Sequence, residues 1–290
     1  MIKFSVVIPL YNKEKEIKDT LKSVLNQTYK ADEIIVVDDG STDNSKEVVK
    51  QFKEIKLIEQ KNCGVSCARN RGIKKARNEY ICFLDADDLW EDSFLEEIKR
   101  LIESFPQAIF YSTSHKMIDE NGKIIKAKTL NNFFGIVDNF FEIFNNNYGL
   151  INSSSVCIRK SANIFFPVGE KKGEDICLWI ELAKKGKLAH SSKPLSVYKL
   201  DASNRSGDIY KKPIIPCQLK WIYQNKATKD IIKFVHKNIL ITVYGNDRGF
   251  AKEIIYFMKK NGDLFYIFLL PKLFLPNHLL KIIKYIRRKI

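Results

Sequence analysis

Residues 80–90 read Tyr-Ile-Cys-Phe-Leu-Asp-Ala-Asp-Asp-Leu-Trp, and this stretch decides the fold. A short apolar run that stops abruptly at charge is typical of a buried strand in a parallel sheet. Ligands of open α/β sheets bind beyond the carboxyl ends of the strands. Asp85 and Asp87 alternate, so they would lie on one side of an extended segment, where paired carboxylates suit Mg²⁺ or Mn²⁺ with a phosphorylated ligand. Alternatively, Asp88 only caps a helix that begins near residue 91.

The chain before this stretch alternates between strand and helix patterns. Strand-like runs cover residues 4–10, 33–37 and 56–59, and helical patterns follow each of them. Alternation of this kind predicts βαβ units and a parallel sheet with right-handed crossovers. Polar groups at three strand ends are therefore expected to meet one ligand: Tyr11-Asn12, Asp38-Asp39 and Asp85-Asp87.

The second half of the chain changes from mixed to helical patterns. Strand-like runs are expected at residues 108–112, 152–158 and 195–198, with a hairpin about Asn121-Gly122, a dipeptide suited to a type I′ turn. A helix is predicted to open at Gly173-Glu174-Asp175 and to end at Gly186. From residue 211 onward the pattern is helical.

Composition indicates a globular protein with an anionic partner. The chain has 290 residues, 45% of them hydrophobic, and a formal net charge of +15. Such a charge favours nucleic acid, a membrane surface or a phosphorylated substrate. The six cysteines are scattered without a Cys-x-x-Cys pair, so we expect reduced thiols and neither a zinc site nor a disulfide framework. With neither a signal peptide nor a membrane-spanning run expected, the sequence predicts an intracellular, reducing compartment.

The last residues, 277–290, predict a basic amphipathic helix. Its apolar stripe is formed by Leu279, Ile282, Ile283, Ile286 and Ile290, and lysines and arginines cover the rest. This pattern favours the surface of an anionic membrane. The alternative is a helix that packs on its own domain.

Six short motifs, in order along residues 4–206, resemble those of the family 2 glycosyltransferases with the GT-A fold. Each motif is weak alone, but their order and spacing together are specific. They are Val7-Ile8-Pro9-Leu10-Tyr11-Asn12, Val37-Asp38-Asp39-Gly40-Ser41-Thr42-Asp43, Asn62-x-Gly64 with Ala68-Arg69-Asn70-x-Gly72, Asp85-x-Asp87-Asp88, Glu174-Asp175, and Tyr198 followed by Asn204-x-Ser206.

The resemblance implies an α/β fold of the GT-A type, a Rossmann-like and mostly parallel sheet, here with a C-terminal helical extension. The glycosyltransferase domain would cover residues 1–210 and the helical region residues 211–290. Within the first domain, residues 1–105 would bind the nucleotide and residues 106–210 the acceptor.

The resemblance also implies a nucleotide-sugar donor. Pro9, Tyr11 and Asp39 would line the nucleoside pocket, where an aromatic ring and a carboxylate suit uracil and hence a UDP-linked sugar. Either Arg69 or Arg71 could face the phosphates, although a single arginine commonly forms only a surface salt bridge. The full set of expected donor-binding residues is Pro9, Tyr11, Asp38, Asp39, Asn62, Arg69, Arg71 and Asp85.

A divalent cation, Mn²⁺ or Mg²⁺, would stabilise the charge of the leaving diphosphate. Asp87 is the expected ligand, with Asp85 near the ribose or the metal. Many relatives carry a metal-binding histidine shortly after the position of Tyr198, whereas this chain has Asp201. An aspartate can still bind a hard cation, but it adds negative charge.

Inversion at the anomeric carbon needs a base for the acceptor hydroxyl. Asp175 is the expected base and Glu174 the alternative. Both acids could instead only stabilise the first turn of their helix.

The predicted function is transfer of a single sugar to a glycan or lipid-linked acceptor in the synthesis of surface polysaccharide or lipooligosaccharide. We expect the enzyme at the inner face of the plasma membrane. A nucleotidyltransferase that makes a sugar nucleotide is the alternative, but the segment after the first strand, residues 9–14, lacks the glycine-rich loop that cradles a triphosphate. A nucleic-acid binder is not expected, because the predicted pocket is acidic.

Overall fold

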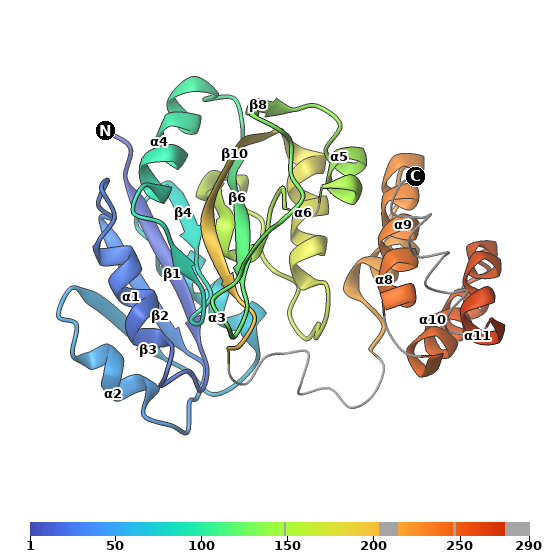
Figure 1. Cartoon of the computed structure of the whole chain (residues 1–290), viewed down its shortest axis with the longest axis horizontal. Coiled ribbons are helices and arrows are strands. Elements are labelled where there is room, and N and C mark those ends of the chain that lie inside the picture. The colour runs from blue at the N-terminus through green and yellow to red at the C-terminus, as the bar shows by residue number, and fades with distance from the viewer. Residues whose placement is uncertain (148, 203–213, 246–247, 276–290) are drawn as a thin grey trace. The chain divides into compact units, whose positions relative to one another are not determined.

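A computed structural model describes residues 1–147, 149–202, 214–245 and 248–275. The chain divides into two compact units, which are considered separately. The first unit comprises Met1–Gly169 and Leu178–Arg205, and the second comprises Glu170–Cys177 and Ser206–Ile290. Figure 1 shows that strands and helices alternate in the first unit and that the C-terminal elements are helical.

A ten-stranded mixed sheet forms the first unit, in the order β3-β2-β1-β4-β9-β6-β10-β5, with β7 paired to β6 and β8 to β10. The strands are β1 (Phe4–Leu10), β2 (Glu33–Asp38), β3 (Ile55–Glu59), β4 (Tyr80–Phe83), β5 (Leu89–Trp90), β6 (Phe110–Ile118), β7 (Ile124–Lys126), β8 (Phe134–Val137), β9 (Val156–Arg159) and β10 (Leu188–Lys199). The first four strands are mutually parallel, whereas β9 is antiparallel to both β4 and β6. The predicted α/β fold, with a parallel sheet in the first part of the chain, is confirmed.

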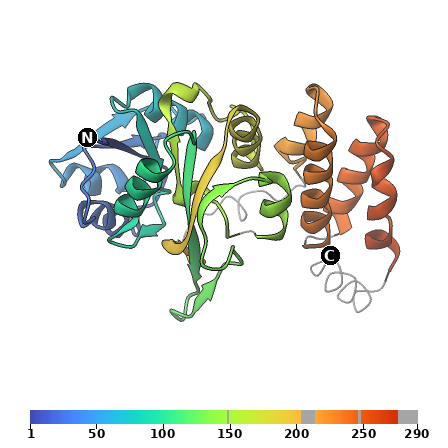
Figure 2. The same cartoon turned by 90° about the horizontal axis from the view of Figure 1, so that it is seen from above.

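The helices connect the strands as the periodicity predicts. They are α1 (Ile17–Leu25), α2 (Ser45–Lys50), α3 (Val65–Lys75), α4 (Phe94–Ser104), α5 (Phe140–Asn146) and α6 (Glu174–Lys185), with short 3₁₀ turns at η1 (Ser153–Ser155) and η2 (Lys160–Ala162). Figure 2 shows helices on both faces of the sheet.

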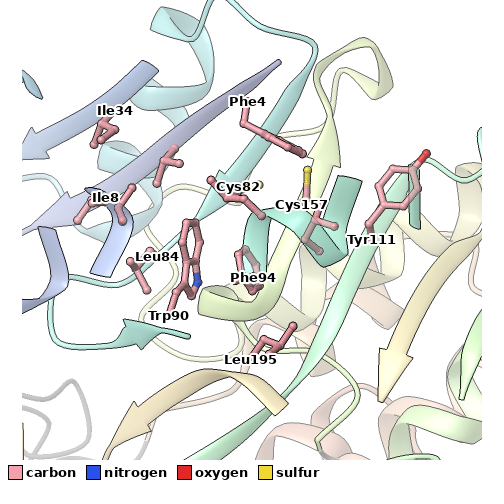
Figure 3. Packing of buried hydrophobic residues seen from close by; sticks show 14 of the residues in the cluster. Phe4, Ile8, Ile34, Cys82, Leu84, Trp90, Phe94, Tyr111, Cys157 and Leu195 are labelled. Carbon is pink, nitrogen blue, oxygen red and sulfur yellow. The ribbon is translucent and has the colours of Figure 1, made fainter. Parts of the chain in front are cut away.

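Alternation along β1 explains why helices cover both faces. Val6, Ile8 and Leu10 point to one face, where they join a buried cluster with residues of α1 and α4. Figure 3 shows part of this cluster, in which Trp90 and Phe94 stack with ring centroids 4.1 Å apart. Val7 points to the other face, toward α3, and a Cβ at Gly72 would stand 2.2 Å from its Cγ1. The glycine therefore lets α3 pack closely on β1.

Two details of the second half differ from the prediction. The hairpin between β6 and β7 turns over residues 119–123, and Asn121 does not have a positive φ, so the turn is not of type I′. The run predicted as a strand at 152–158 begins instead as η1, where the Asn152 N–H donates to Ser155 Oγ at 2.9 Å and the Ser155 N–H donates to the Asn152 carbonyl at 3.2 Å.

In the part of the second unit that the structure describes, the chain is helical from Cys217 to Phe274, as predicted. Its elements are α8 (Cys217–Gln224), α9 (Lys229–Gly245), α10 (Arg248–Lys260), η3 (Leu264–Leu269) and α11 (Pro271–Phe274). Among the described residues, no helix is long and apolar enough to cross a membrane. The predicted amphipathic tail at 277–290 lies outside the described residues.

One prediction about the cysteines was wrong. Cys177 was expected to be a reduced, apolar core residue, but it forms a disulfide with Cys217 within the second unit. The two cysteines are 40 positions apart, and sequence spacing alone does not show that the start of α6 meets the start of α8. Cys63, Cys67, Cys82 and Cys157 are free, as expected.

Candidate functional site

Three loops leave the sheet at one edge. β1 lies between β2 and β4 and is parallel to both, so the residues that follow these strands emerge side by side. Pro9 is paired with Val37, and Leu10 with Asp38, at the end of the ladder. The predicted meeting of the three strand ends is therefore built into the register of the sheet.

Side-chain hydrogen bonds join the loop after β1 to the loop after β2. Asn12 adopts a left-handed conformation with φ 51°. Its backbone N–H donates to Ser41 Oγ at 3.0 Å, and its Oδ1 accepts from the Thr42 N–H at 2.8 Å. The Lys13 N–H donates to Ser45 Oγ at 2.8 Å. These bonds fix the backbone of residues 12–13 relative to the second loop.

Asp38 and Asp39 are buried and use their carboxylates on backbone groups. Asp38 accepts from the Ser41 N–H. Asp39 accepts from the N–H groups of Cys63 at 3.0 Å and Gly64 at 2.8 Å, and from the Gln60 side chain at 2.8 Å. Asp39 therefore shapes the loop that contains Asn62, which is the loop predicted to lie at the donor.

The other expected nucleoside contacts are divided between core and surface. Pro9 is buried within β1, whereas Tyr11 is 38% exposed just beyond the strand. Asn62 is exposed. An exposed aromatic ring at this edge of the sheet can stack on a base.

The carboxylates of Asp85 and Asp87 each meet a cation. Asp85 Oδ1 lies 2.6 Å from the Arg69 guanidinium, and Asp87 Oδ2 lies 2.7 Å from Lys13 Nζ. The acids are 28% and 19% exposed in their side chains, so both retain access to solvent. Burial and the charge of Asp85 raise the pKa of the Asp87 carboxyl, and the ammonium of Lys13 opposes that shift.

Sequence reasoning missed Lys13. It follows the strand-end pair Tyr11-Asn12 directly, so its position at the site edge was readable. A lone lysine among the many of this basic chain gave no reason to select it. Its partner Asp87 is 74 residues away.

Of the two candidate arginines, the structure places Arg69 at the acids. The Arg69 side chain is 3% exposed, and its guanidinium lies 4.9 Å from the centre of the Phe166 ring. Asn70 holds Phe166 in place, because its amide group bonds both the backbone N–H and the carbonyl of that residue at 2.8 Å. Arg71 is exposed. The helical period therefore separates the two arginines.

Asp88 does not cap a helix, because α4 begins at Phe94 with Ser93 before it. Its carboxylate is buried and accepts from Ser154 Oγ at 2.5 Å and from the Lys199 N–H at 3.4 Å. Burial, together with the charges of Asp85 and Asp87, raises the pKa of the Asp88 carboxyl well above its ordinary value. Asp88 therefore braces the acidic loop against η1 and β10.

Glu174 and Asp175 lie in the second unit, at the start of α6, and both are half-buried. The Ile176 N–H donates to Asp175 Oδ1 at 2.8 Å, and acidic residues are favoured in the first turn of a helix. The preceding Gly173 has φ +76°, and a Cβ there would stand 2.0 Å from Gln218 Oε1. With the Cys177–Cys217 disulfide, this close packing fixes the turn that carries both acids.

Asp201 is exposed after β10 in the first unit. In the part of the chain that the structure describes, no three His, Cys, Asp or Glu side chains form a group that could hold a metal ion. The expected set of Asp85, Asp87 and Asp201 is thus not assembled there. The motif residues 204–206 lie outside the described residues.

Comparison with known proteins agrees with this architecture. Residues 5–165 match the family described as "Glycosyl transferase family 2". The chain belongs to this family.

Two curated proteins and one solved structure are similar to this chain. An uncharacterised glycosyltransferase of Rickettsia bellii is 37% identical over 70% of this chain and 29% of its own length. The Escherichia coli protein named UDP-Glc:alpha-D-GlcNAc-diphosphoundecaprenol beta-1,3-glucosyltransferase WfaP is 30% identical over 89% of this chain and 98% of its own. The solved structure of S. aureus TarS 1-349 in complex with UDP-GlcNAc superposes with a TM-score of 0.64 and 20% identity, over 91% of this chain and 73% of that chain.

The match covers about a third of the length of the first curated relatives, at 29% and 34%. At 20% identity, the likeness to TarS shows the fold alone, and it confirms the predicted fold of the GT-A type.

The environment of Asp88 predicts a pH-dependent stability. An acid whose folded-state pKa lies above its reference value of 3.8 binds its proton more tightly when folded. The free energy of unfolding therefore falls as the pH rises from that reference value through the raised pKa. Asp88→Asn cannot ionise, so we expect a flatter profile in urea unfolding between about pH 4 and pH 8 in metal-free buffer.

The matched control for this measurement is Asp92→Asn, which changes an exposed acid nearby. Its unfolding free energy should follow the wild-type pH profile. Parallel profiles for wild type and Asp88→Asn would contradict the buried, proton-binding role of Asp88.

Proposed function

We propose that this protein is an inverting glycosyltransferase that moves one sugar from a UDP-linked donor to a glycan or lipid-linked acceptor. The observation that carries the proposal is the cluster at the joined strand ends, where Asp85 and Asp87 face Arg69 and Lys13. Such a cluster provides both oxygen ligands for a cation and cations for a diphosphate. Two similar proteins support the donor class, since WfaP is named for UDP-Glc and TarS was solved with UDP-GlcNAc.

The proposed cofactor is Mn²⁺ or Mg²⁺, held by Asp87 with Asp85 beside it. The residues fit this group, because two partly exposed carboxylates at one loop are hard oxygen ligands. When bound, the cation would neutralise charge on the leaving diphosphate. Arg69 supports the same charge from a buried, ring-stacked position.

We propose Asp175 as the base. It would take the proton of the acceptor hydroxyl while the hydroxyl oxygen bonds to the anomeric carbon and the bond to the diphosphate breaks on the opposite face. Its rigid turn at the start of α6 supports this role, because a base must be held in place to act. Glu174 is the neighbouring alternative.

We extend the proposal to a lipid-linked acceptor and to the inner face of the plasma membrane. WfaP is named for a diphosphoundecaprenol acceptor, which supports a lipid-linked acceptor and a role in surface-glycan synthesis at the inner face of the plasma membrane.

The second unit also exposes large apolar side chains beside exposed Lys259 and Lys260. The exposed fractions are 68% for Tyr256, 70% for Leu264, 51% for Ile267, 57% for Phe268 and 76% for Phe274. Apolar surface flanked by lysines suits an anionic membrane.

The first test is a panel of nucleotide sugars with Mn²⁺ present, scored by transfer and hydrolysis. A UDP-linked sugar should be consumed, and chelation or Asp87→Asn should lower turnover by about a hundredfold or more, because the leaving charge loses its stabilisation. Asp19→Asn, an exposed acid on α1, is the control and should retain wild-type turnover. Activity that survives both chelation and Asp87→Asn would refute the metal role.

The base is tested by Asp175→Asn. We expect kcat to fall by about 10²–10⁴-fold with unchanged UDP affinity, because only proton removal is lost. Glu174→Gln should retain most of the activity. If Glu174→Gln is the inactive variant, the roles of the two acids are exchanged. If neither variant changes kcat, the two acids serve only the helix start.

Membrane binding is tested with vesicles that contain anionic lipid. Deletion of 277–290 should weaken binding by about tenfold or more, and so should the pair Ile267→Ser and Phe268→Ser, because each removes apolar or basic contact area. Neutral vesicles are the control. Retention of full vesicle binding by both variants would argue against this location.

A further inference from the structure

Both exposed acids of the site are already neutralised by the chain itself. Asp85 is paired with Arg69 and Asp87 with Lys13, at 2.6 Å and 2.7 Å. A metal ion that binds either carboxylate would therefore have to displace a cationic side chain. One of the two ion pairs must open when a metal ion binds.

The Arg69 pair is the fixed one. The Arg69 side chain is 3% exposed, and its guanidinium stacks on the Phe166 ring at 4.9 Å. Phe166 is held in turn by both groups of the Asn70 amide and packs edge-on against Phe83 at 5.3 Å. A planar guanidinium held by a ring and a carboxylate has little freedom to leave.

The Lys13 pair joins a fixed backbone to a long aliphatic side chain that is 10% exposed. The Lys13 backbone is fixed, because its N–H donates to Ser45 Oγ and its carbonyl accepts from the N–H groups of Glu16 and Ile17. Its ammonium stands on a flexible four-carbon stem and meets Asp87 at 2.7 Å. The stem can therefore swing the charge away from Asp87 while its base stays in the site.

A divalent cation on Asp87 and the ammonium of Lys13 repel each other strongly at such short range. A diphosphate relieves this repulsion, because its negatively charged oxygens can contact the metal ion and the Lys13 ammonium at the same time. Metal and nucleotide should consequently bind far better together than apart.

We propose that Lys13 couples metal binding to donor binding. In the free protein Lys13 holds Asp87; when the donor arrives, its ammonium moves to the diphosphate and releases Asp87 to the metal. The proposal rests on the function given above, a nucleotide-diphosphate donor with a cation at Asp87. The coupling between two binding equilibria is reciprocal. Lys13 therefore makes bound metal raise the affinity for UDP, and bound UDP raise the affinity for the metal by the same factor.

The test is a titration of Mn²⁺ with the free cation followed by electron paramagnetic resonance, without and with saturating UDP. For wild type we expect weak Mn²⁺ binding alone and at least about tenfold tighter binding with UDP. Lys13→Gln should bind Mn²⁺ about tenfold more tightly without UDP, and UDP should then tighten it much less. Lys15→Gln makes the same charge change at an exposed position two residues away and should behave as wild type.

Each outcome decides the proposal. Equal Mn²⁺ affinity of wild type with and without UDP would overturn it, even if Lys13→Gln did not fold. Folded Lys13→Gln with unchanged Mn²⁺ affinity and unchanged coupling would overturn the role of Lys13 while leaving the proposed function intact. No binding of either Mn²⁺ or UDP to wild type would overturn both.

Discussion

The parallel pairing of β1 with both β2 and β4 is the constraint on which the site depends. The ladder brings Leu10, Asp38 and the residues after Phe83 to one edge of the sheet. Burial of β1 on both faces keeps that register in place, since a slip of one residue would turn Val7 away from α3 and bring a residue of the opposite face against Gly72. The polar loops can therefore diverge in sequence and still meet.

The acids at this edge of the sheet differ in burial and in the groups that compensate their charge. Asp88 is the most buried of Asp85, Asp87 and Asp88, and its carboxyl has a pKa raised by burial and is held by Ser154 and Lys199. Asp85 and Asp87, which reach solvent, are met by Arg69 and Lys13. Three neighbouring carboxylates are thus tolerated because they differ in burial and partner. One acidic motif in the sequence yields three different environments.

Much of this fold was readable from local patterns. The bounds of β1, the presence of a helix after it and the alternation through β4 follow from apolar periodicity and strand-end polarity. The family motifs pointed to Asp85 and Asp87, and left Arg69 and Arg71 as alternatives, of which the structure places Arg69 at the acids. Contacts between distant positions were not readable, which is why Lys13, the Cys177–Cys217 disulfide and the Asn70–Phe166 bonds came only from the structure. Periodicity reports which face a residue occupies, and does not report which residue stands opposite.

The bracing of Asp88 has a consequence for synthesis of the chain. Its partners Ser154 and Lys199 follow it by 66 and 111 residues, and β4 lacks its neighbour β9 until residues 156–159 emerge. A nascent chain that ends near residue 105 would leave an open sheet edge and a carboxyl group without its two hydrogen-bond donors. Residues 1–105 therefore lack the contacts that complete this part of the sheet. A chimera built on this protein must carry the segment through Lys199 to keep the sheet and the Asp88 hydrogen bonds intact.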